Sequence, residues 1–207
     1  MKSHDELNKH RAEVLSKAMF AQVMAVDTET NGKDVRDGRG FCVGISIAYR
    51  HNSKVEAAYY PVAHTKNNIS DEMKRQLFHI LCSRVALIMH NAKFDIVSLA
   101  TAGVDISKCK YYCTMLMTHM MNENLMSKGL DYLSKKLLKK EGKLKGPDWE
   151  WAFKIFGWSA EFPSEIMDRY ATGDAVDTLE LFEGGYPAFK KAGFDGEGSV
   201  YVGCHDL

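Results

Sequence analysis

The spacing of apolar and polar residues along the chain predicts an ordered series of helices and strands. Apolar residues recur at helical intervals among charged ones over residues 3–19, which predicts a leading helix through Leu7, Val14, Leu15 and Met19. Three strand-like stretches follow at 21–27, 41–49 and 55–62. The polar, glycine-containing segment 31–40 joins the first two in the manner of an antiparallel hairpin connection.

The second half of the chain alternates short strands with helices. Ser70 followed by two acids is a helix-start signal, so we expect a helix from there to about residue 82. Further expected elements are a strand at 86–90, a helix at 93–102 closed by Gly103, a strand near 109–113, a helical stretch at 114–122, a helix opened by Gly129, and a long final helix with Pro163 in its first turn. This order predicts an α/β fold, a mixed five-stranded sheet flanked by helices.

Length and charge narrow the class of protein. The 207 residues, 45% of them apolar, suit one domain. We divide the chain into an N-terminal helix at 1–19, a main domain at 20–190 and a glycine-rich tail at 191–207. The formal net charge is zero, which disfavours a protein that coats duplex DNA but not one that grips a few nucleotides. The charged N-terminus and the lack of a membrane-length apolar run predict a cytoplasmic protein with no membrane partner.

The cysteines add no metal site to this picture. There are five of them, an odd number, and no CxxC pair occurs, which is typical of a reducing compartment. Cys109 and Cys113 are four residues apart, but His119 alone does not complete a zinc site.

Two carboxylates lie one residue apart where the first apolar strand stops, in MAVDTET. Side chains alternate along a strand, so Asp27 and Glu29 should point to the same face. Like charges this close repel each other unless a cation or a hydrogen-bond donor separates them. The pair therefore predicts a positively charged partner.

Two further acids could join this pair. Asp95 follows the strand ALIMH, in the first turn of the next expected helix, and parallel strands gather functional groups at their carboxyl ends. Tyr170 and Asp174 are four apart on the final helix, hence on one face, which Asp177 and Thr178 should continue. Four oxygen ligands without a Cys/His cluster favour Mg²⁺ or Mn²⁺. A pair of such ions is suited to phosphoryl displacement.

These segments also resemble a known family. DTET at 27–30, HNAKFD at 90–95 and YATGD at 170–174 are similar, in order and spacing, to the three motifs of DEDD-type 3′–5′ exonucleases of the tyrosine subgroup. The nearest resemblance is to the proofreading domain of family A DNA polymerases of bacteria and phages, supported by AAYYPVAH at 57–64 and CTMLMTHMMN at 113–122. The similarity covers roughly residues 20–190.

The resemblance implies a ribonuclease H-like fold and hydrolysis of single-stranded DNA from its 3′ end to 5′-mononucleotides, in proofreading or end trimming. It implies two Mg²⁺ (or Mn²⁺), with Asp27, Glu29 and Asp174 on the first, Asp27 bridging to the second, and Asp95 holding the second through water. Tyr170 would orient the attacking water, and Thr28 and Asn91 would contact the substrate. A DNA polymerase module or subunit is the implied protein partner, and the gene could come from a phage.

Several alternatives stay open at this stage. The substrate could be RNA, as for a ribonuclease D-like enzyme, or the chain could be a nucleic-acid-binding domain with lapsed catalysis, although all five catalytic positions are present. In the family, an apolar side chain a few residues after the first motif commonly inserts between the last bases of the strand. Here the polar or small residues 31–33 take that place, which leaves Phe41 or the aromatic residues of 149–156 as candidates for this wedge. Lysines of 134–146 are interpreted as a solvated helix face, and methionines of 115–121 as core. His64, His90 and His119 receive no role.

Overall fold

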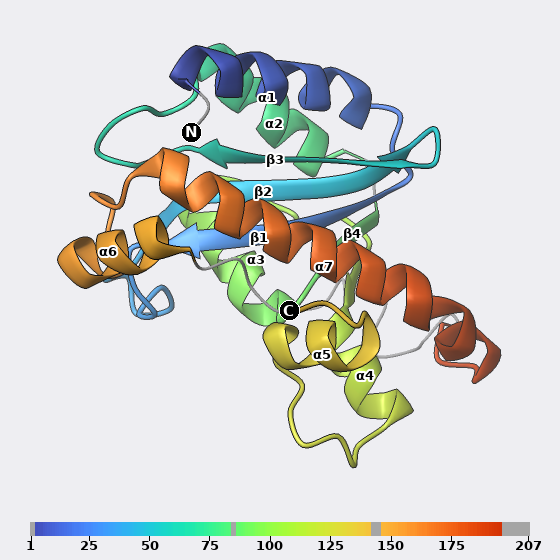
Figure 1. Ribbon diagram of the computed structural model, residues 1–207. Helices are drawn as coiled ribbons and strands as arrows, with labels where there is room; N and C mark the ends of the chain where they lie inside the picture. The colour runs from blue at the N-terminus through green and yellow to red at the C-terminus, as the bar shows by residue number, and fades with distance from the viewer. Residues whose placement is uncertain (1–2, 84–85, 142–145, 196–207) are drawn as a thin grey trace.

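The computed structural model describes residues 3–83, 86–141 and 146–195 (Figure 1). The strands are β1 (Val23–Thr30), β2 (Cys42–His51), β3 (Lys54–Pro61), β4 (Ala86–Met89) and β5 (Tyr111–Cys113). The helices are α1 (His4–Ala18), α2 (Asp71–Leu81), α3 (Ala92–Thr101), α4 (Thr114–Met121), α5 (Leu130–Leu137), α6 (Pro147–Phe156) and α7 (Ser164–Lys191).

The five strands form one mixed sheet in the order β3-β2-β1-β4-β5, which confirms the predicted fold class. β1, β2 and β3 are antiparallel neighbours, whereas β1, β4 and β5 run parallel. The hairpin between β2 and β3 turns through Asn52 and Ser53, both with positive φ (50° and 64°), as a two-residue hairpin turn requires. The carboxyl ends of β1, β4 and β5 therefore meet at one edge of the sheet.

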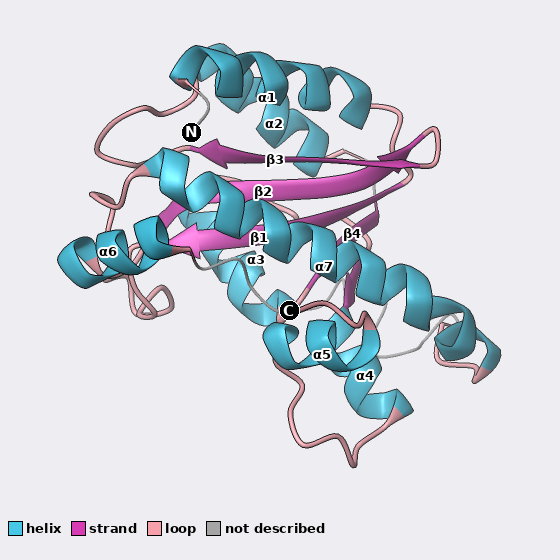
Figure 2. Ribbon diagram, in the orientation of Figure 1, coloured by secondary structure: helices cyan, strands magenta, loops and turns pink. Residues whose placement is uncertain are grey.

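Helices cover both faces of the sheet (Figure 2). Along β1, Met24 and Val26 lie in the core that also contains Leu15 of α1, Leu77 of α2 and Leu99 of α3. The intervening Ala25 packs on the opposite face with side chains of α7, among them Leu179 and Phe182. Even-numbered residues of β1 thus face α1, α2 and α3, and odd-numbered residues face α7, which crosses the sheet in Figure 1.

A buried arginine joins α1 to the rest of the fold. The Arg11 side chain is 1% exposed, and its guanidinium donates to the Tyr59 carbonyl of β3 (2.6 Å) and to the Asp168 carboxylate of α7 (3.2 Å). It also donates to Asn8 within α1 (2.9 Å). A buried charge needs such partners because desolvation disfavours an isolated one. Arg11 therefore fixes α1, β3 and the amino-terminal part of α7 relative to one another.

Several predicted helix ends are confirmed by their capping bonds. Ser3 and Glu6 form a capping box at the start of α1, and Ser70 accepts a hydrogen bond from the Met73 amide at the start of α2. Gly103 has φ 85° just after α3, the left-handed conformation that commonly ends a helix.

Other predictions were wrong in detail. α1 ends at Ala18, so Met19 is 68% exposed instead of lying on the apolar face. Pro163 precedes α7 as its N-cap rather than lying in its first turn. β1 extends to Thr30 because it stays paired with β2, so Asp27 and Glu29 lie inside the strand. Helix α6 was not predicted at all.

Parts of the predicted tail (196–207) and lysine segment (142–145) lie outside the described residues. Among the residues that the structure does describe, none of the helices combines the length and the hydropathy needed to cross a bilayer.

Candidate active site

The carboxyl half of β1 presents functional side chains to both faces of the sheet. Asp27 and Glu29 are odd-numbered and face α7, whereas Thr28 faces the layer that contains α3. Because β1 is a regular strand up to Glu29, its backbone sets the direction of all three side chains.

Asp174 of α7 completes a group of three acids with Asp27 and Glu29. One carboxylate oxygen from each of the three lies within 4.8 Å of the others. Glu29 and Asp174 are each only 6% exposed. The structure thus brings together three of the four predicted ligands, from segments almost 150 residues apart in the chain.

The donor set of this acidic cluster fits a divalent cation. Three carboxylates that are close together and partly desolvated repel one another, and a cation among them would turn that repulsion into attraction. All three donors are oxygens, the ligands that Mg²⁺ and Mn²⁺ prefer, and no soft sulfur or imidazole ligand belongs to the group.

Asp95 lies outside this cluster, on the other side of β1. Its Oδ1 accepts hydrogen bonds from the Thr28 amide (3.1 Å) and the Thr28 hydroxyl (2.8 Å). Burial raises the pKa of the Asp95 carboxyl, since the charged form is desolvated, and the two bonds from Thr28 oppose that shift. Thr28 therefore fixes the position of Asp95 relative to Asp27 and Glu29.

A sharp turn places Asp95 at this position. β4 ends at Met89, and Asn91 precedes α3 with a left-handed backbone, φ 68°. Asparagine tolerates this conformation better than most residues. The turn puts Asp95 in the first turn of α3, and Asn91 itself is exposed at the same edge of the sheet.

Tyr170 lies one turn before Asp174, next to the aromatic side chains of α6 and the following loop. Its ring centroid is 5.4 Å from that of Trp149 and 6.4 Å from that of Trp158. Thr178 is buried and continues the face of Tyr170 and Asp174 as predicted. Asp177, seven residues after Tyr170, also lies on this side of α7, where it pairs with Lys140.

Lys140 corrects the interpretation of the lysine segment as simply solvated. Its ammonium group contacts both Asp177 and Glu180 of α7, the latter at 2.8 Å. Burial lowers the pKa of Lys140, but the hydrogen bonds and charges of Asp177 and Glu180 together outweigh it, so the pKa is raised. Of the wedge candidates, Trp149 is buried, whereas Trp151 is 58% exposed and Phe41 is also on the surface.

Sequence reasoning missed a buried pair beside the acids, Tyr59 and His64. The Tyr59 hydroxyl and His64 Nε2 are 2.6 Å apart, and His64 Nδ1 lies 2.8 Å from the Phe162 carbonyl. A carbonyl only accepts, so Nδ1 carries the proton and Tyr59 donates to Nε2. Burial and the charge of Glu29 raise the pKa of Tyr59. Both residues belong to the segment AAYYPVAH, which supports the family resemblance, but the sequence alone does not indicate a role for its histidine.

Comparisons with known proteins point to one family. The 3′–5′ exonuclease domain family of A-type DNA polymerases matches residues 5–184. The DNA polymerase DpoZ of Salmonella phage PMBT28 is 33% identical over 172 residues, which is 77% of this chain and 25% of the polymerase. DNA polymerase I of Pseudomonas aeruginosa is 30% identical over 131 residues, 60% of this chain and 14% of that protein. The chain thus spans a quarter or less of these relatives.

Solved structures share the fold at lower identity. NrnC of Brucella melitensis with bound Mg²⁺ superposes with a TM-score of 0.61 at 19% identity, covering 87% of this chain and 79% of NrnC. RNase D of Trypanosoma brucei gives a TM-score of 0.61 at 14% identity, covering 87% of this chain and 61% of that one. The sheet and its helices are therefore those of ribonuclease H-like exonucleases.

Proposed function

Because this chain belongs to the 3′–5′ exonuclease domain family of A-type DNA polymerases, we propose that it removes nucleotides from the 3′ end of single-stranded DNA and releases 5′-mononucleotides. The observation that carries this proposal is the convergence of Asp27, Glu29 and Asp174 beside Asp95 and Tyr170. Proofreading or end trimming is the role that such an activity would serve.

The geometry of the acids supports the ligands of one ion, and the family resemblance implies those of a second. Asp27, Glu29 and Asp174 would hold one Mg²⁺ or Mn²⁺. Asp27 would be shared with a second ion, and Asp95 would hold that second ion through water. When bound, two divalent ions supply an activated water and neutralise charge on the reacting phosphate.

The remaining residues would position the reactants. A tyrosine has a pKa near 10, too high to deprotonate water efficiently near neutral pH, so Tyr170 would orient the attacking water rather than act as its base. Packing against Trp149 restricts the Tyr170 ring. Thr28 would fix Asp95, and exposed Asn91 would contact the strand or orient Asp95.

DNA is the favoured substrate because the relatives with 30% identity or more are DNA polymerases. A polymerase module or subunit is the corresponding partner, since this chain matches only about a quarter of the phage enzymes. The fold shared with RNase D keeps RNA as the second candidate substrate. A binding domain with lapsed catalysis is disfavoured because the five proposed catalytic side chains are all present.

The test uses 5′-labelled DNA and RNA oligonucleotides of identical sequence, incubated with Mg²⁺, with Mn²⁺ or with EDTA. We expect a ladder that shortens from the 3′ end of DNA only when metal is present, and much slower digestion of RNA. Faster digestion of RNA would select the second substrate. Undegraded but retarded oligonucleotide would indicate a binding domain.

Two variants distinguish activity of the proposed site from activity of a contaminating nuclease. Asp27→Ala should remove nearly all activity while the melting temperature stays at or above that of the wild type, because one repelling acid is lost. Asp37→Ala is the matched control, since Asp37 is exposed and pairs with neighbouring Arg39. Full activity in Asp27→Ala would refute the metal assignment.

A further inference from the structure

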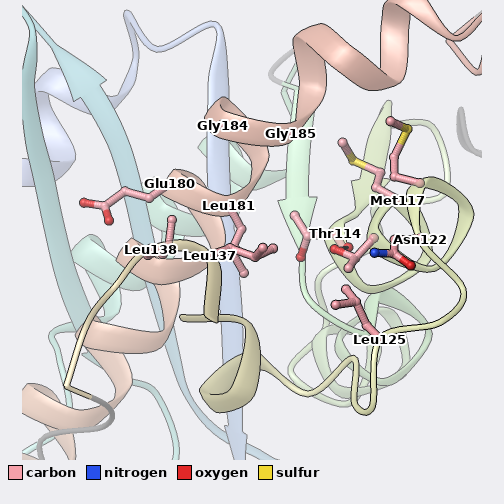
Figure 3. Close-up of a pocket in the computed structure, with 12 residues that line it drawn as sticks. Thr114, Met117, Asn122, Leu125, Leu137, Leu138, Glu180, Leu181, Gly184 and Gly185 are labelled. Carbon is pink, nitrogen blue, oxygen red and sulfur yellow. Dashed lines mark hydrogen bonds between the residues drawn. The ribbon is translucent and has the colours of Figure 1, made fainter. Parts of the chain in front are cut away.

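A cavity of about 400 Å³ opens between α4, α5 and α7 (Figure 3). Its walls are mainly apolar and include Met117, Leu125, Leu137, Leu138 and Leu181. Leu137 is half exposed, so apolar surface also surrounds the mouth of the cavity. Concave, mostly apolar hollows with a few polar groups are the usual form of sites for small organic groups.

The cavity lies on the same face of α7 as the proposed catalytic residues. Leu181 is seven residues after Asp174, and Gly185 is eleven after it, so both lie on the stripe of Tyr170 and Asp174. At 1.5 Å per residue, Leu181 is roughly 10 Å from Asp174 along the helix axis. Thr178 is buried between them, so a strand bound at Asp174 would pass outside Thr178 to reach the cavity.

A hydrogen-bonded histidine connects the cavity wall to the segment that carries Asp95. Thr114 lines the cavity, and its hydroxyl is 2.8 Å from His90 Nδ1. The other ring nitrogen of His90 is 2.8 Å from the Lys128 carbonyl, in the loop that contributes Leu125. His90 directly precedes Asn91, so the wall and the proposed substrate edge are fixed to each other.

Two adjacent glycines keep the cavity open. Gly184 and Gly185 lie inside α7 and line the cavity, and a Cβ at either position would meet no heavy atom within 4 Å. Glycine is unfavourable in a helix interior compared with alanine. Close packing does not require glycine at these positions, and its effect is to leave space beside α7.

We propose that this cavity binds the base of a nucleotide about three positions upstream of the cleaved bond; the inference rests on the proposed function. A stacked strand rises 3.4 Å per nucleotide, so about three nucleotides span the roughly 10 Å between Asp174 and Leu181. The faces of a base are apolar and suit leucine and methionine walls. Its edges are polar and suit the side-chain amide of Asn122, which Figure 3 shows at the wall.

The charges at the rim agree with a base rather than a phosphate as the occupant. Glu180 is paired with Lys140 at 2.8 Å, and the described residues that line the cavity include no lysine, arginine or histidine that would attract a phosphate. The sugar–phosphate backbone would therefore stay outside, with the base inserted.

The test compares two double variants at Gly184 and Gly185 that differ in the size of the side chains they introduce. Gly184→Leu/Gly185→Leu places two large side chains where the cavity is open, whereas Gly184→Ala/Gly185→Ala adds two methyl groups. Both pairs replace glycine by a better helix former, so both should retain or raise the melting temperature. A change seen only in the leucine pair then reports the loss of the cavity.

Each protein is titrated, in EDTA, with labelled single-stranded DNA that carries one abasic position, moved stepwise from the 3′ end. We expect the wild type and the alanine pair to lose affinity about tenfold when the abasic position is near the fourth nucleotide from the 3′ end, the third upstream of the cleaved bond, in line with the loss of one stacked base. The leucine pair should bind intact DNA about tenfold more weakly and be insensitive to the abasic position there. The same abasic penalties in all three proteins would overturn the proposal.

Hydrolysis of the p-nitrophenyl ester of thymidine 5′-monophosphate distinguishes this inference from the proposed function. That substrate has no upstream nucleotide, so the leucine pair should hydrolyse it at the wild-type rate. If the wild type does not hydrolyse it or any oligonucleotide, the proposed function fails. If the wild type does and the abasic scan is flat, only the base site fails.

Discussion

The ring of Tyr59 occupies the space that a side chain on Gly44 would need. Gly44 pairs with Glu29 across β1 and β2, so this close approach lies on the sheet face that carries the acids. Tyr59 packs there in the same cluster as Tyr170 and Trp149. The absence of a side chain at one position of β2 thus lets β3 contribute to the surroundings of the candidate active site.

Gly44→Ala should therefore destabilise the protein. The new methyl group would overlap the Tyr59 ring, and overpacking of this kind costs about 1–3 kcal/mol. Urea denaturation measures the loss. Gly184→Ala is the control because a Cβ there meets open space, and it should be neutral or stabilising. Equal stability of the two variants would contradict the close approach.

Stability should fall as the pH drops below about 6.5, in part through His64. Burial lowers the pKa of His64, and Arg11 adds to this, while the Phe162 carbonyl and Glu165 oppose it. The unfolded state, with a histidine pKa of about 6.5, then binds the proton more readily than the folded state. As the pH falls from about 6.5 to the lower folded-state pKa, the free energy of unfolding should decrease. Above about pH 6.5, His64 should not contribute to the pH dependence of the free energy of unfolding.

Urea denaturation of the wild type and of His64→Gln at several pH values measures this contribution. The variant loses the titrating group, so its stability should depend less steeply on pH between about 6.5 and 5. Identical slopes in the two proteins would show that His64 does not titrate differently on folding.

Arg11→Met should destabilise the fold by roughly 3 kcal/mol, since it removes one partner of a buried ion pair and leaves the Tyr59 carbonyl without its donor. Asp168→Asn is the milder comparison, because Arg11 keeps its bonds to Asn8 and the Tyr59 carbonyl. Chemical denaturation of both variants gives the two costs. If Arg11→Met unfolds like the wild type, the buried arginine does not stabilise the attachment of α1.

Tyr170→Phe should slow turnover about ten- to hundredfold, the size of effect produced by a misplaced reactant. The phenylalanine ring keeps the packing against Trp149, so stability should change little. Single-turnover digestion of labelled DNA measures the rate, and Mn²⁺ titration measures metal affinity, which should match the wild type. An unchanged rate would assign the orientation of the water to another group.

Thr28→Val should weaken metal binding at the Asp95 side of β1. Valine keeps the shape of threonine and the backbone bond to Asp95 but removes the hydroxyl bond of 2.8 Å. We expect the Mg²⁺ concentration for half-maximal activity to rise several-fold with little change in KM for DNA. The matched control is Thr30→Val, which alters a hydroxyl bonded to the Gly32 carbonyl instead.

The sequence predicted the acids well because strand and helix periodicity determine which side chains share a face. Asp27 and Glu29 were expected on one face, and Tyr170 and Asp174 on one face of the final helix, and the structure has both arrangements. Periodicity along one element does not report which residue a neighbouring segment contacts. The ion pair of Asp177 with Lys140, which comes from a segment 37 residues away, was therefore not predicted.

Helix α6 was missed although its signals were present. Pro147 lies at the first helical position, and buried Trp149 and Ala152 are three residues apart, as one face of a helix requires. From the sequence, the aromatic residues of this segment were considered only as candidates for the wedge. The extra length of β1 had no local signal, because pairing with β2 extends a strand past the point where its apolar run stops.

The acidic cluster also determines when the chain can first be active. Asp27 and Glu29 are synthesised early, but Asp174 lies on α7, the last helix among the described residues, so the third carboxylate reaches the other two only after α7 has docked on the sheet. Under the proposed function, a nascent or truncated chain lacking that helix would not cleave nucleic acid. Cleavage would then require docked α7, and a protease cut ahead of α7 followed by its release would abolish it.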